Sequence, residues 1–440
     1  MVTTIKLEHI NLHKEGKDMK KIVLSTLLLT ISLMSSSLAS NVIKTKADTT
    51  KYNLKQYKNV ILFIGDGMGT KHVDVGGIFK GEPLSFDVVN EKWTYHAYSN
   101  TDSRTSEGFT LDTSKSLIDP KQNSTLYDGT PSPYSPEGSK LGTSGNITTY
   151  TDSAAGGSAL ACGIKFTNSR IGMDIDGTNV ENLVEIAKGL NKKAGVVTSD
   201  NIVGATPSDF LVHVGERHLS DDIIRGLAHS KADLVMAQNV EDYKNNQATY
   251  ENLFKNQGFD ISYNTSSLDI DSKRILGLFP GVMPKSDPRA PTLEELTVFA
   301  LDYLDNEEGF FLMVEGSNID KRSHSNQTKL MLDELLGFDA AVEAATNWAD
   351  AREDTLIIVT ADHETGALYY DEDATQDTII EDIHWLSTNH SRARVDIAVY
   401  GDISDYIKEY GDNFEELEGL PYWDNTDIFK LCSSYLGAYK

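Results

Sequence analysis

The chain has 440 residues, of which 39% are hydrophobic and 24% charged, and its formal net charge is −26 at pH 7. This length and composition allow a large buried core, so we expect one large domain with loop insertions. The acidic balance excludes the broad basic surface that nucleic acids and anionic membranes require, and neither is expected as a partner.

The N-terminal region is predicted to be a signal peptide. Met19 is followed by two lysines, an apolar run from Ile22 to Met34 and the small-residue segment Ser37-Leu38-Ala39, an order typical of secretory signals. We predict a signal peptide over residues 1–39, with an N-terminal extension before Met19, and a mature chain that starts near Ser40. An uncleaved anchor is the alternative. No second long apolar run follows, so the mature protein is expected to be secreted, periplasmic or extracellular, without a membrane span.

The first strand of the core is predicted at Val60 to Ile64, a continuous apolar run. Such runs are typical of strands buried on both faces of a parallel sheet. Asp66 follows in a Gly-Asp-Gly-Met-Gly loop. Because ligands gather beyond the carboxyl ends of these strands, Asp66 is a candidate metal ligand.

Two polar stretches interrupt the predicted domain, which spans residues 40–440. They lie near residues 100–150 and 244–273, and the first is dense in Ser, Thr, Gly, Pro and Asp. We interpret both as insertions at the periphery of the sheet.

Ser153 lies at the predicted start of a helix. The segment from Thr151 to Gly163 begins with small residues and continues with a helical pattern. The free amides and dipole of a helix N-terminus favour an anion, which would suit a nucleophilic serine. A serine in this position is more often only a helix cap, so the feature alone does not identify a catalytic residue. Of the two cysteines, Cys162 is interpreted as a buried free thiol, although a disulfide with Cys432 stays open.

Helical and strand patterns alternate through the rest of the chain. Helices are predicted over Glu181–Leu190 and Leu330–Trp348, with another opening at a capping box that starts at Thr292. Strands are predicted over Ala194–Thr198 and Val395–Tyr400. This alternation predicts an α/β fold with a central, mostly parallel sheet flanked by helices on both faces.

Two further apolar strands, at residues 310–314 and 356–359, lead into residue types that bind metals. The residues that follow them are Glu315, Asp320, His324, Asp362 and His363. So many acidic groups at one edge of a sheet would repel one another without cations, so the sequence predicts a metal site. The four-residue spacing of Asp320 and His324 is weak evidence by itself, because an aspartate and a histidine so spaced are a common pair on a helix surface. His213, inside an apolar stretch, is interpreted as structural.

Together these segments resemble the alkaline phosphatases. The motifs occur in the family's order from about Tyr57 to Gly401, and their number and order make coincidence implausible. They are Gly-Asp-Gly-Met-Gly at Asp66, Asp152-Ser153-Ala154-Ala155, Ala205-Thr206-Pro207 with Arg217, Glu315-Gly316-Ser317 with Asp320 and His324, Thr360-Ala361-Asp362-His363, and His390 before a strand.

The resemblance implies a role for each matching residue. It implies that Ser153 is the nucleophile and that the planar guanidinium of Arg217 grips two phosphoryl oxygens. It also implies two Zn²⁺ and one Mg²⁺ per chain. The implied ligands are Asp320, His324 and His390 for the first zinc, Asp66, Asp362 and His363 for the second, and Asp66, Thr206 and Glu315 for the magnesium.

The implied activity is hydrolysis of small-molecule phosphate monoesters to an alcohol and inorganic phosphate, through a phosphoserine, by a homodimer. A phosphodiesterase or mutase of the same superfamily is an alternative, and so is a secreted protein that binds metal without catalysis. A sulfatase is excluded because Cys162 does not open the Cys-x-Pro-x-Arg motif. A conventional serine hydrolase is disfavoured because Ser153 lacks a Gly-x-Ser-x-Gly elbow.

The chain departs from the family's pattern at two positions. Gly204, two residues before Thr206, stands where the best-known relatives carry an Asp or His that orders water around the magnesium. Lys321 stands where some relatives carry Trp, and its ammonium is expected to bind the substrate phosphate directly or through water. We expect Gly204 to leave a gap and magnesium to be held loosely, and we expect an aspartate in place of Gly204 to tighten it.

Overall fold

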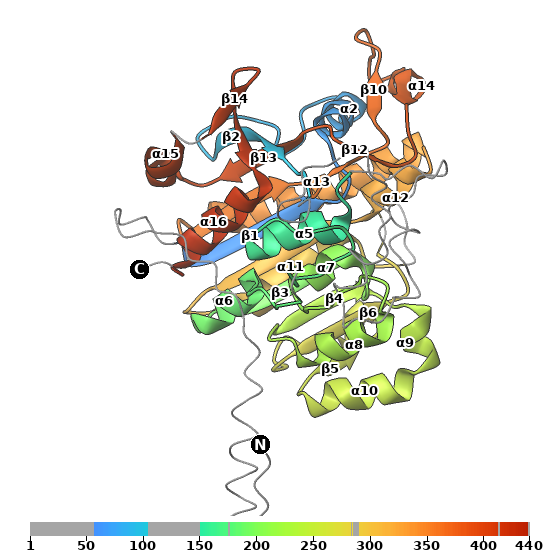
Figure 1. Cartoon of the computed structure of the whole chain (residues 1–440), viewed down its shortest axis with the longest axis vertical. Helices are drawn as coiled ribbons and strands as arrows, with labels where there is room; N and C mark the ends of the chain where they lie inside the picture. The colour runs from blue at the N-terminus through green and yellow to red at the C-terminus, as the bar shows by residue number, and fades with distance from the viewer. Residues whose placement is uncertain are drawn as a thin grey trace, which may run out of the picture. The chain divides into compact units, whose positions relative to one another are not determined.

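The computed structural model describes residues 57–103, 150–174, 177–282, 284, 290–411 and 414–438 (Figure 1). The predicted signal peptide and most of the first polar stretch lie outside these residues, so both stay predictions. Within the described part of the chain, no helix is both long enough and apolar enough to cross a membrane.

The core is an 11-stranded sheet with the order β14-β15-β2-β13-β8-β1-β7-β3-β4-β6-β5. From β8 to β5 every neighbouring pair is parallel. These strands are β1 (Asn59–Gly65), β3 (Lys193–Asn201), β4 (Leu234–Gln238), β5 (Asp260–Ser262), β6 (Ile275–Phe279), β7 (Phe310–Gly316) and β8 (Thr355–Thr360). The apolar runs predicted as buried strands are therefore the centre of the sheet.

The other end of the sheet is mixed. Strand β13 (Val395–Tyr400) pairs antiparallel with both β8 and β2 (Trp93–Asn100). Strand β15 (Leu420–Asp424) is parallel to β2, and β14 (Glu415–Leu417) forms a hairpin with β15. The predicted fold class, a mostly parallel sheet with helices on both faces, is confirmed.

Side chains of β1 alternate between two buried clusters, one on each face of the sheet, as the two-residue period of a strand requires. Val60, Leu62 and Ile64 belong to the first cluster, and Ile61 and Phe63 to the second. The helices of the first cluster are α5 (Ser153–Cys162), α6 (Leu183–Gly189), α7 (Ala205–Asp209), α8 (Ser220–His229), α9 (Glu241–Asn245), α10 (Gln247–Asn256), α15 (Ser404–Tyr410) and α16 (Asn425–Leu436). Those of the second are α2 (Thr70–Lys80), α11 (Leu293–Leu304), α12 (Asn318–His324), α13 (Thr328–Asp350) and α14 (Ile379–Asp382).

Two short antiparallel ladders extend the chain beyond the carboxyl end of β8. Strand β9 (Glu364–Thr365) pairs with β12 (His390–Ser391), and β10 (Leu368–Tyr370) pairs with β11 (Ile383–Trp385). The first ladder sets His390 opposite Thr365. This pairing carries a histidine from a late segment back to the end of the central strands.

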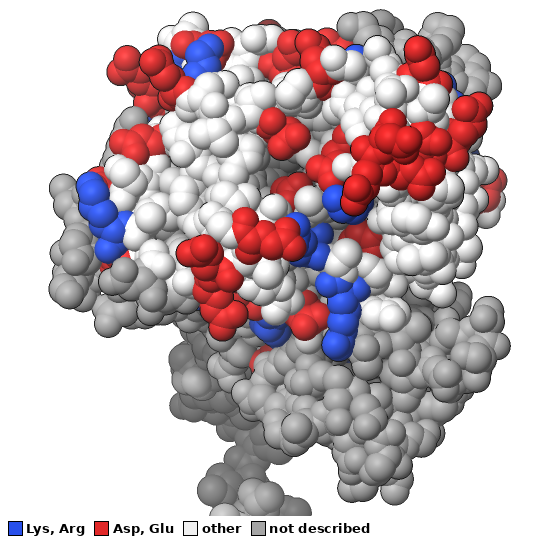
Figure 2. Space-filling model, turned by 90° about the horizontal axis from the view of Figure 1, so that it is seen from above, with Lys and Arg blue, Asp and Glu red and all other residues white. Residues whose placement is uncertain are grey.

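Several local predictions are confirmed. The capping box of α11 is present, with Thr292 Oγ1 accepting from the Glu295 amide at 3.0 Å. Cys162 and Cys432 are buried, and they form no disulfide in the described part of the chain. The polar stretch at 244–273 contributes α10, a short 3₁₀ turn (Thr265–Ser267) and β5, the edge strand of the sheet, and its interpretation as an insertion stays a prediction. On the face seen in Figure 2, acidic side chains cover more of the described surface than basic ones, in line with the net charge of −26.

Candidate functional site

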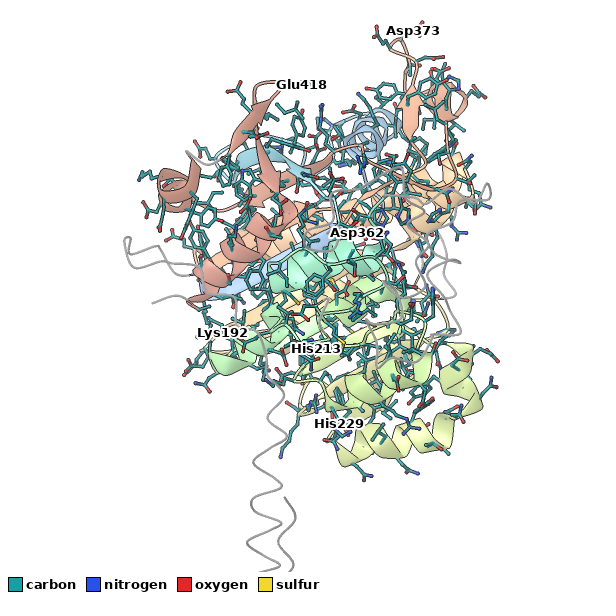
Figure 3. The ribbon with its side chains drawn as sticks, in the orientation of Figure 1. Lys192, His213, His229, Asp362, Asp373 and Glu418 are labelled. Atoms are coloured by element: carbon teal, nitrogen blue, oxygen red, sulfur yellow. The ribbon has the colours of Figure 1, made fainter. Side chains whose placement is uncertain are left out.

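The candidate site lies at the carboxyl ends of three neighbouring strands, β8, β1 and β7. In the parallel register, Ile64 lies beside both Glu315 and Thr360. The residues that follow, Asp66 and Asp362, therefore leave the sheet at the same edge. Figure 3 labels Asp362 at this edge.

Asp66, Asp362 and His363 form the first candidate ligand group, and all three are buried. His363 Nε2 lies 3.5 Å from Asp66 Oδ1 and 3.3 Å from Asp362 Oδ2. The amides of Gly67 and His363 donate to Oδ1 of Asp362, which leaves its Oδ2 facing the group. Among the described residues, Asp66 Oδ1 and Asp362 Oδ2 have no hydrogen-bond partner. Two orphaned carboxylate oxygens beside an imidazole nitrogen fit a bound cation.

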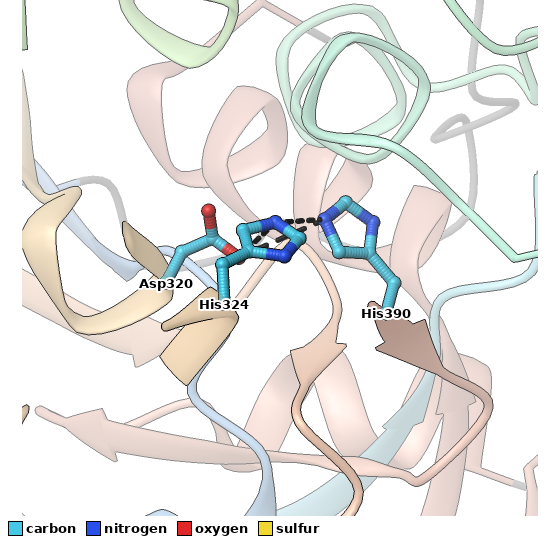
Figure 4. A group of neighbouring side chains, drawn as sticks. All are labelled: Asp320, His324 and His390. Carbon is cyan, nitrogen blue, oxygen red and sulfur yellow. Dashed lines mark hydrogen bonds and ion pairs between the residues drawn. The ribbon is translucent and has the colours of Figure 1, made fainter. Parts of the chain in front are cut away.

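Asp320, His324 and His390 form the second candidate ligand group (Figure 4). The Nε2 atoms of the two histidines lie 3.1 Å apart, and they are 3.3 Å and 3.6 Å from Asp320 Oδ1. Their Nδ1 atoms lie 2.6 Å from the carbonyl oxygens of Thr388 and Thr151, respectively. Each Nδ1 therefore carries a proton that it donates to a carbonyl oxygen, and in this tautomer the Nε2 atom is the one available to bind a cation. Two acceptors this close to each other and to a carboxylate fit a shared cation.

Glu315 and Thr206 supply further side-chain oxygens that could bind a cation. Among the described residues, Glu315 Oε1 and Thr206 Oγ1 are buried without a hydrogen-bond partner. The second oxygen of Glu315, Oε2, accepts from the hydroxyl of Thr198 on β3. Together with Asp66 these atoms are an oxygen-only donor set, which suits Mg²⁺.

Asp66, Glu315 and Asp362 hold protons more tightly than ordinary carboxyl groups when no cation is bound. Burial, followed by neighbouring carboxylates, raises the pKa of Asp66 well above its usual value. Burial is also the first cause of the raised pKa of Glu315, about 8, and of Asp362, about 7. Burial lowers the pKa of His363 well below its usual value, so its ring is neutral. A neutral imidazole among carboxylates is the state in which both can bind metal.

Ser153 is the first residue of α5, where the helix dipole favours negative charge. The preceding Asp152 caps the helix by accepting from the Ala155 amide at 2.9 Å. Ser153 Oγ lies 3.2 Å from His363 Nε2, and the His363 ring stacks on that of His390 with centroids 3.6 Å apart. The predicted nucleophile is thus in contact with one ligand group, and stacking connects that group to the other.

Arg217 reaches the N-terminus of α5 from the segment between α7 and α8. Its Nη1 donates to Asp152 Oδ2 at 3.3 Å, and the same oxygen accepts from the Ser169 amide at 2.8 Å. Burial alone would lower the pKa of Arg217, but the carboxylates of Asp152, Asp66 and Asp209 together outweigh burial and raise it. The guanidinium is therefore charged and held beside Ser153.

The expectation that Gly204 leaves a gap is wrong. A Cβ on Gly204 would lie 2.3 Å from Oδ2 of Asp200, so another carboxylate already fills that space. Asp200 also forms an ion pair with Lys321, which is where the structure places the Lys321 ammonium. Sequence reasoning missed Asp200 and Thr198, although both lie at the carboxyl end of β3, the kind of position that identified Asp66.

His213 lies apart from the site (Figure 3). Its Nδ1 is 2.8 Å from the carbonyl oxygen of Gly172, and its Nε2 is 3.2 Å from Glu185 Oε2. Both ring nitrogens therefore have structural partners, as expected.

Comparison with known proteins decides the family. A family model described as "Alkaline phosphatase" matches residues 138–251 and 249–416. The chain belongs to the alkaline phosphatase family. Membership agrees with the sequence resemblance and supports a phosphatase enzyme.

Bacillus subtilis alkaline phosphatases are among the relatives in this family. Alkaline phosphatase 4 of strain 168 is 32% identical over 73% of this chain and 64% of its own length. Alkaline phosphatase 3 is 28% identical over 88% of this chain and 79% of its own length. The alkaline phosphatase of the Antarctic bacterium TAB5 matches in structure with a TM-score of 0.66 and 25% identity, covering 88% of this chain and 100% of the other.

Proposed function

We propose that this alkaline phosphatase family member hydrolyses phosphate monoesters to an alcohol and inorganic phosphate through a phosphoserine at Ser153. The observation that carries the proposal is the contact of Ser153 Oγ, at a helix N-terminus, with His363 of one ligand group whose ring stacks on His390 of the other. A nucleophile beside two cation sites and a guanidinium is the arrangement that phosphoryl transfer requires.

The donor atoms fit two Zn²⁺ and one Mg²⁺ per chain. Asp320, His324 and His390 would hold one zinc, Asp66, Asp362 and His363 the second, and Asp66, Thr206 and Glu315 the magnesium. Bound there, the cations supply Lewis-acid polarisation of the nucleophile, the phosphoryl group and the leaving oxygen. A variant of the TAB5 phosphatase has been solved with Mg bound in a site called M3, which supports a magnesium site in this family.

The chain's own residues perform the binding and the transfer. Arg217 binds two phosphoryl oxygens with its fork of N–H donors, and the Asp152 carboxylate fixes the orientation of that fork. Ser153 Oγ attacks phosphorus, so a P–Oγ bond forms while the ester P–O bond breaks and the alcohol leaves. Water then cleaves the P–Oγ bond, which regenerates the serine and releases inorganic phosphate.

We also propose a secreted, periplasmic or extracellular homodimer without a membrane anchor after processing. The signal-peptide pattern over residues 1–39 supports export and cleavage. Mass spectrometry of exported protein should give an N-terminus near Ser40, whereas an intact Met1 on a membrane-bound product contradicts this.

Assays with p-nitrophenyl phosphate and bis-p-nitrophenyl phosphate, with and without added zinc and magnesium, test the function. We expect metal-dependent cleavage of the monoester and far slower cleavage of the diester. Preference for the diester would indicate a phosphodiesterase of the same superfamily. Metal binding with no cleavage of either ester would indicate a non-catalytic metal-binding protein.

A further inference from the structure

Asp200 requires a glycine at position 204. The backbone of Gly204, with φ −54° and ψ 145°, is open to any residue. A Cβ there would nevertheless lie 2.3 Å from Oδ2 and 3.0 Å from Cβ of Asp200, so the whole aspartate side chain would have to move. Space for Asp200, and not backbone strain, explains the glycine.

Asp200 is fixed by the end of β3 and is 8% exposed. Its amide donates to Thr198 Oγ1 at 2.7 Å, and the Thr198 hydroxyl in turn donates to Glu315. The amide and side chain of Asn201 donate to Asp200 Oδ1 at 2.6 Å and 2.9 Å. These bonds hold the Asp200 carboxylate in place. Thr198 connects the backbone of Asp200 to Glu315, a candidate magnesium ligand.

Lys321 shares this environment and follows the metal ligand Asp320 directly. Its ammonium donates to Asp200 Oδ1 and, at 3.3 Å, to Ser317 Oγ. The Lys321 side chain is 43% exposed, so part of it is open to the solvent from which substrate and product phosphate arrive. A charged donor already paired with a carboxylate must give up or share that pairing before it can bind phosphate.

We propose that Asp200 is a positioning residue of the site: by pairing with the Lys321 ammonium it weakens the hold of that cation on phosphate, and so limits affinity for the inorganic phosphate product. This inference rests on the proposed phosphatase function. The residue that limits phosphate affinity is thus Asp200, whose carboxylate occupies the space beside Gly204.

Calorimetric titration of inorganic phosphate into zinc- and magnesium-loaded protein tests the proposal. We expect Asp200→Asn to bind phosphate about three- to tenfold more tightly, because Lys321 loses its competitor, and Lys321→Met to bind it more weakly. In the Lys321→Met background, Asp200→Asn should lose most of its effect, since two residues that act as a pair are not additive. Gly204→Ala, which displaces the Asp200 side chain, should tighten phosphate binding as Asp200→Asn does.

The matched control is Asp305→Asn. It breaks an ion pair with Arg352 of 2.9 Å, in which both side chains are 32% exposed, at the opposite end of β7 from Glu315. Phosphate affinity should not change in this control.

Unchanged or weaker phosphate binding in folded Asp200→Asn, or an equal gain in the Lys321→Met background, would overturn the inference. If the wild-type protein cleaves p-nitrophenyl phosphate and Asp200→Asn leaves phosphate affinity unchanged, only this inference fails. If the wild-type protein binds phosphate but cleaves no ester, the proposed function fails while the coupling between Asp200 and Lys321 is still measured.

Discussion

At the scale of single residues, hydrogen bonds to the backbone determine which atom of each candidate ligand is available to bind a cation. His324 and His390 each use Nδ1 on a backbone carbonyl, and Asp362 uses Oδ1 on two amides. The remaining atoms, Nε2 of each histidine and Oδ2 of Asp362, face the candidate cation sites. The backbone thus orients the ligands before any metal binds, and this lowers the cost of ordering them on binding.

Replacing the nucleophile should separate chemistry from metal binding. Ser153→Ala removes the attacking oxygen but none of the carboxylates or imidazoles, so we expect kcat to fall on the order of 10³-fold or more while zinc and magnesium stay bound. Acid quenching followed by mass spectrometry should find phosphoserine at Ser153 in the wild-type protein and none in the variant. A phosphoserine trapped at another residue would contradict the assignment.

Replacing Arg217 should mainly weaken phosphate binding. Loss of a charged, two-pronged donor costs roughly 10- to 100-fold in phosphate affinity, so Arg217→Ala should raise both KM and the inhibition constant of inorganic phosphate by that factor. Arg217→Lys should restore little, because an ammonium cannot reproduce the planar fork. Arg225→Ala is the control, since Arg225 pairs with Asp221 on the exposed surface of α8. Equal losses in both alanine variants would point to a general effect of charge.

At the scale of elements, α5 lies so close to the end of β8 that its glycines are part of the site. A Cβ on Gly156 would lie 2.5 Å from the carbonyl oxygen of Asp362. Small residues therefore let the helix that carries Ser153 approach Asp362, the candidate metal ligand that follows β8.

Gly156→Ala should be destabilising even though alanine favours helices. The clash with Asp362 backbone outweighs the helix preference, so we expect a loss of about 1–3 kcal/mol in unfolding free energy together with weaker zinc binding. Gly77→Ala in α2 is the matched control: its Cβ would lie 3.6 Å from the nearest atom, so a gain of up to about 1 kcal/mol is expected. Urea unfolding and metal analysis measure both effects. Equal stability of the two variants would show that α5 can shift away from Asp362 at little cost.

The sequence predicts a strand well where an apolar run ends in a polar residue. It predicts poorly those features that depend on a contact with a distant segment of the chain. Val60–Ile64 followed by Asp66 could be read directly, because burial on both faces requires an unbroken apolar run. The run Val395–Tyr400 is also a strand, but its apolar pattern does not reveal that it pairs antiparallel with β8. The role of Asp200 depends on a contact with Lys321 across 121 positions of sequence, which no local pattern encodes.

At the scale of the whole molecule, the site concentrates negative charge at the centre of an already acidic chain. Burial raises the pKa of Glu315 to about 8 and that of Asp362 to about 7. Between their usual pKa values and these, the metal-free fold binds more protons than the unfolded chain, so its stability falls as pH rises. His363, whose pKa is lowered from 6.5 by burial, acts in the opposite direction only below about pH 6.5. The range from about 6.5 to about 8 therefore reports on the carboxyl groups.

Removal of metal should therefore destabilise the protein more strongly at pH 8 than at pH 6.5. With cations bound, the same carboxylates are held deprotonated, so the loss of stability between these two pH values should be smaller in the loaded protein. Other buried carboxyl groups that are not candidate ligands, such as Asp396 with a pKa of about 7, are expected to affect both forms alike and to cancel in the difference. Urea unfolding of EDTA-treated and metal-restored protein at the two pH values measures the gap. A gap that stays constant or narrows as pH rises would mean that Glu315 and Asp362 are not the groups that the cations compensate.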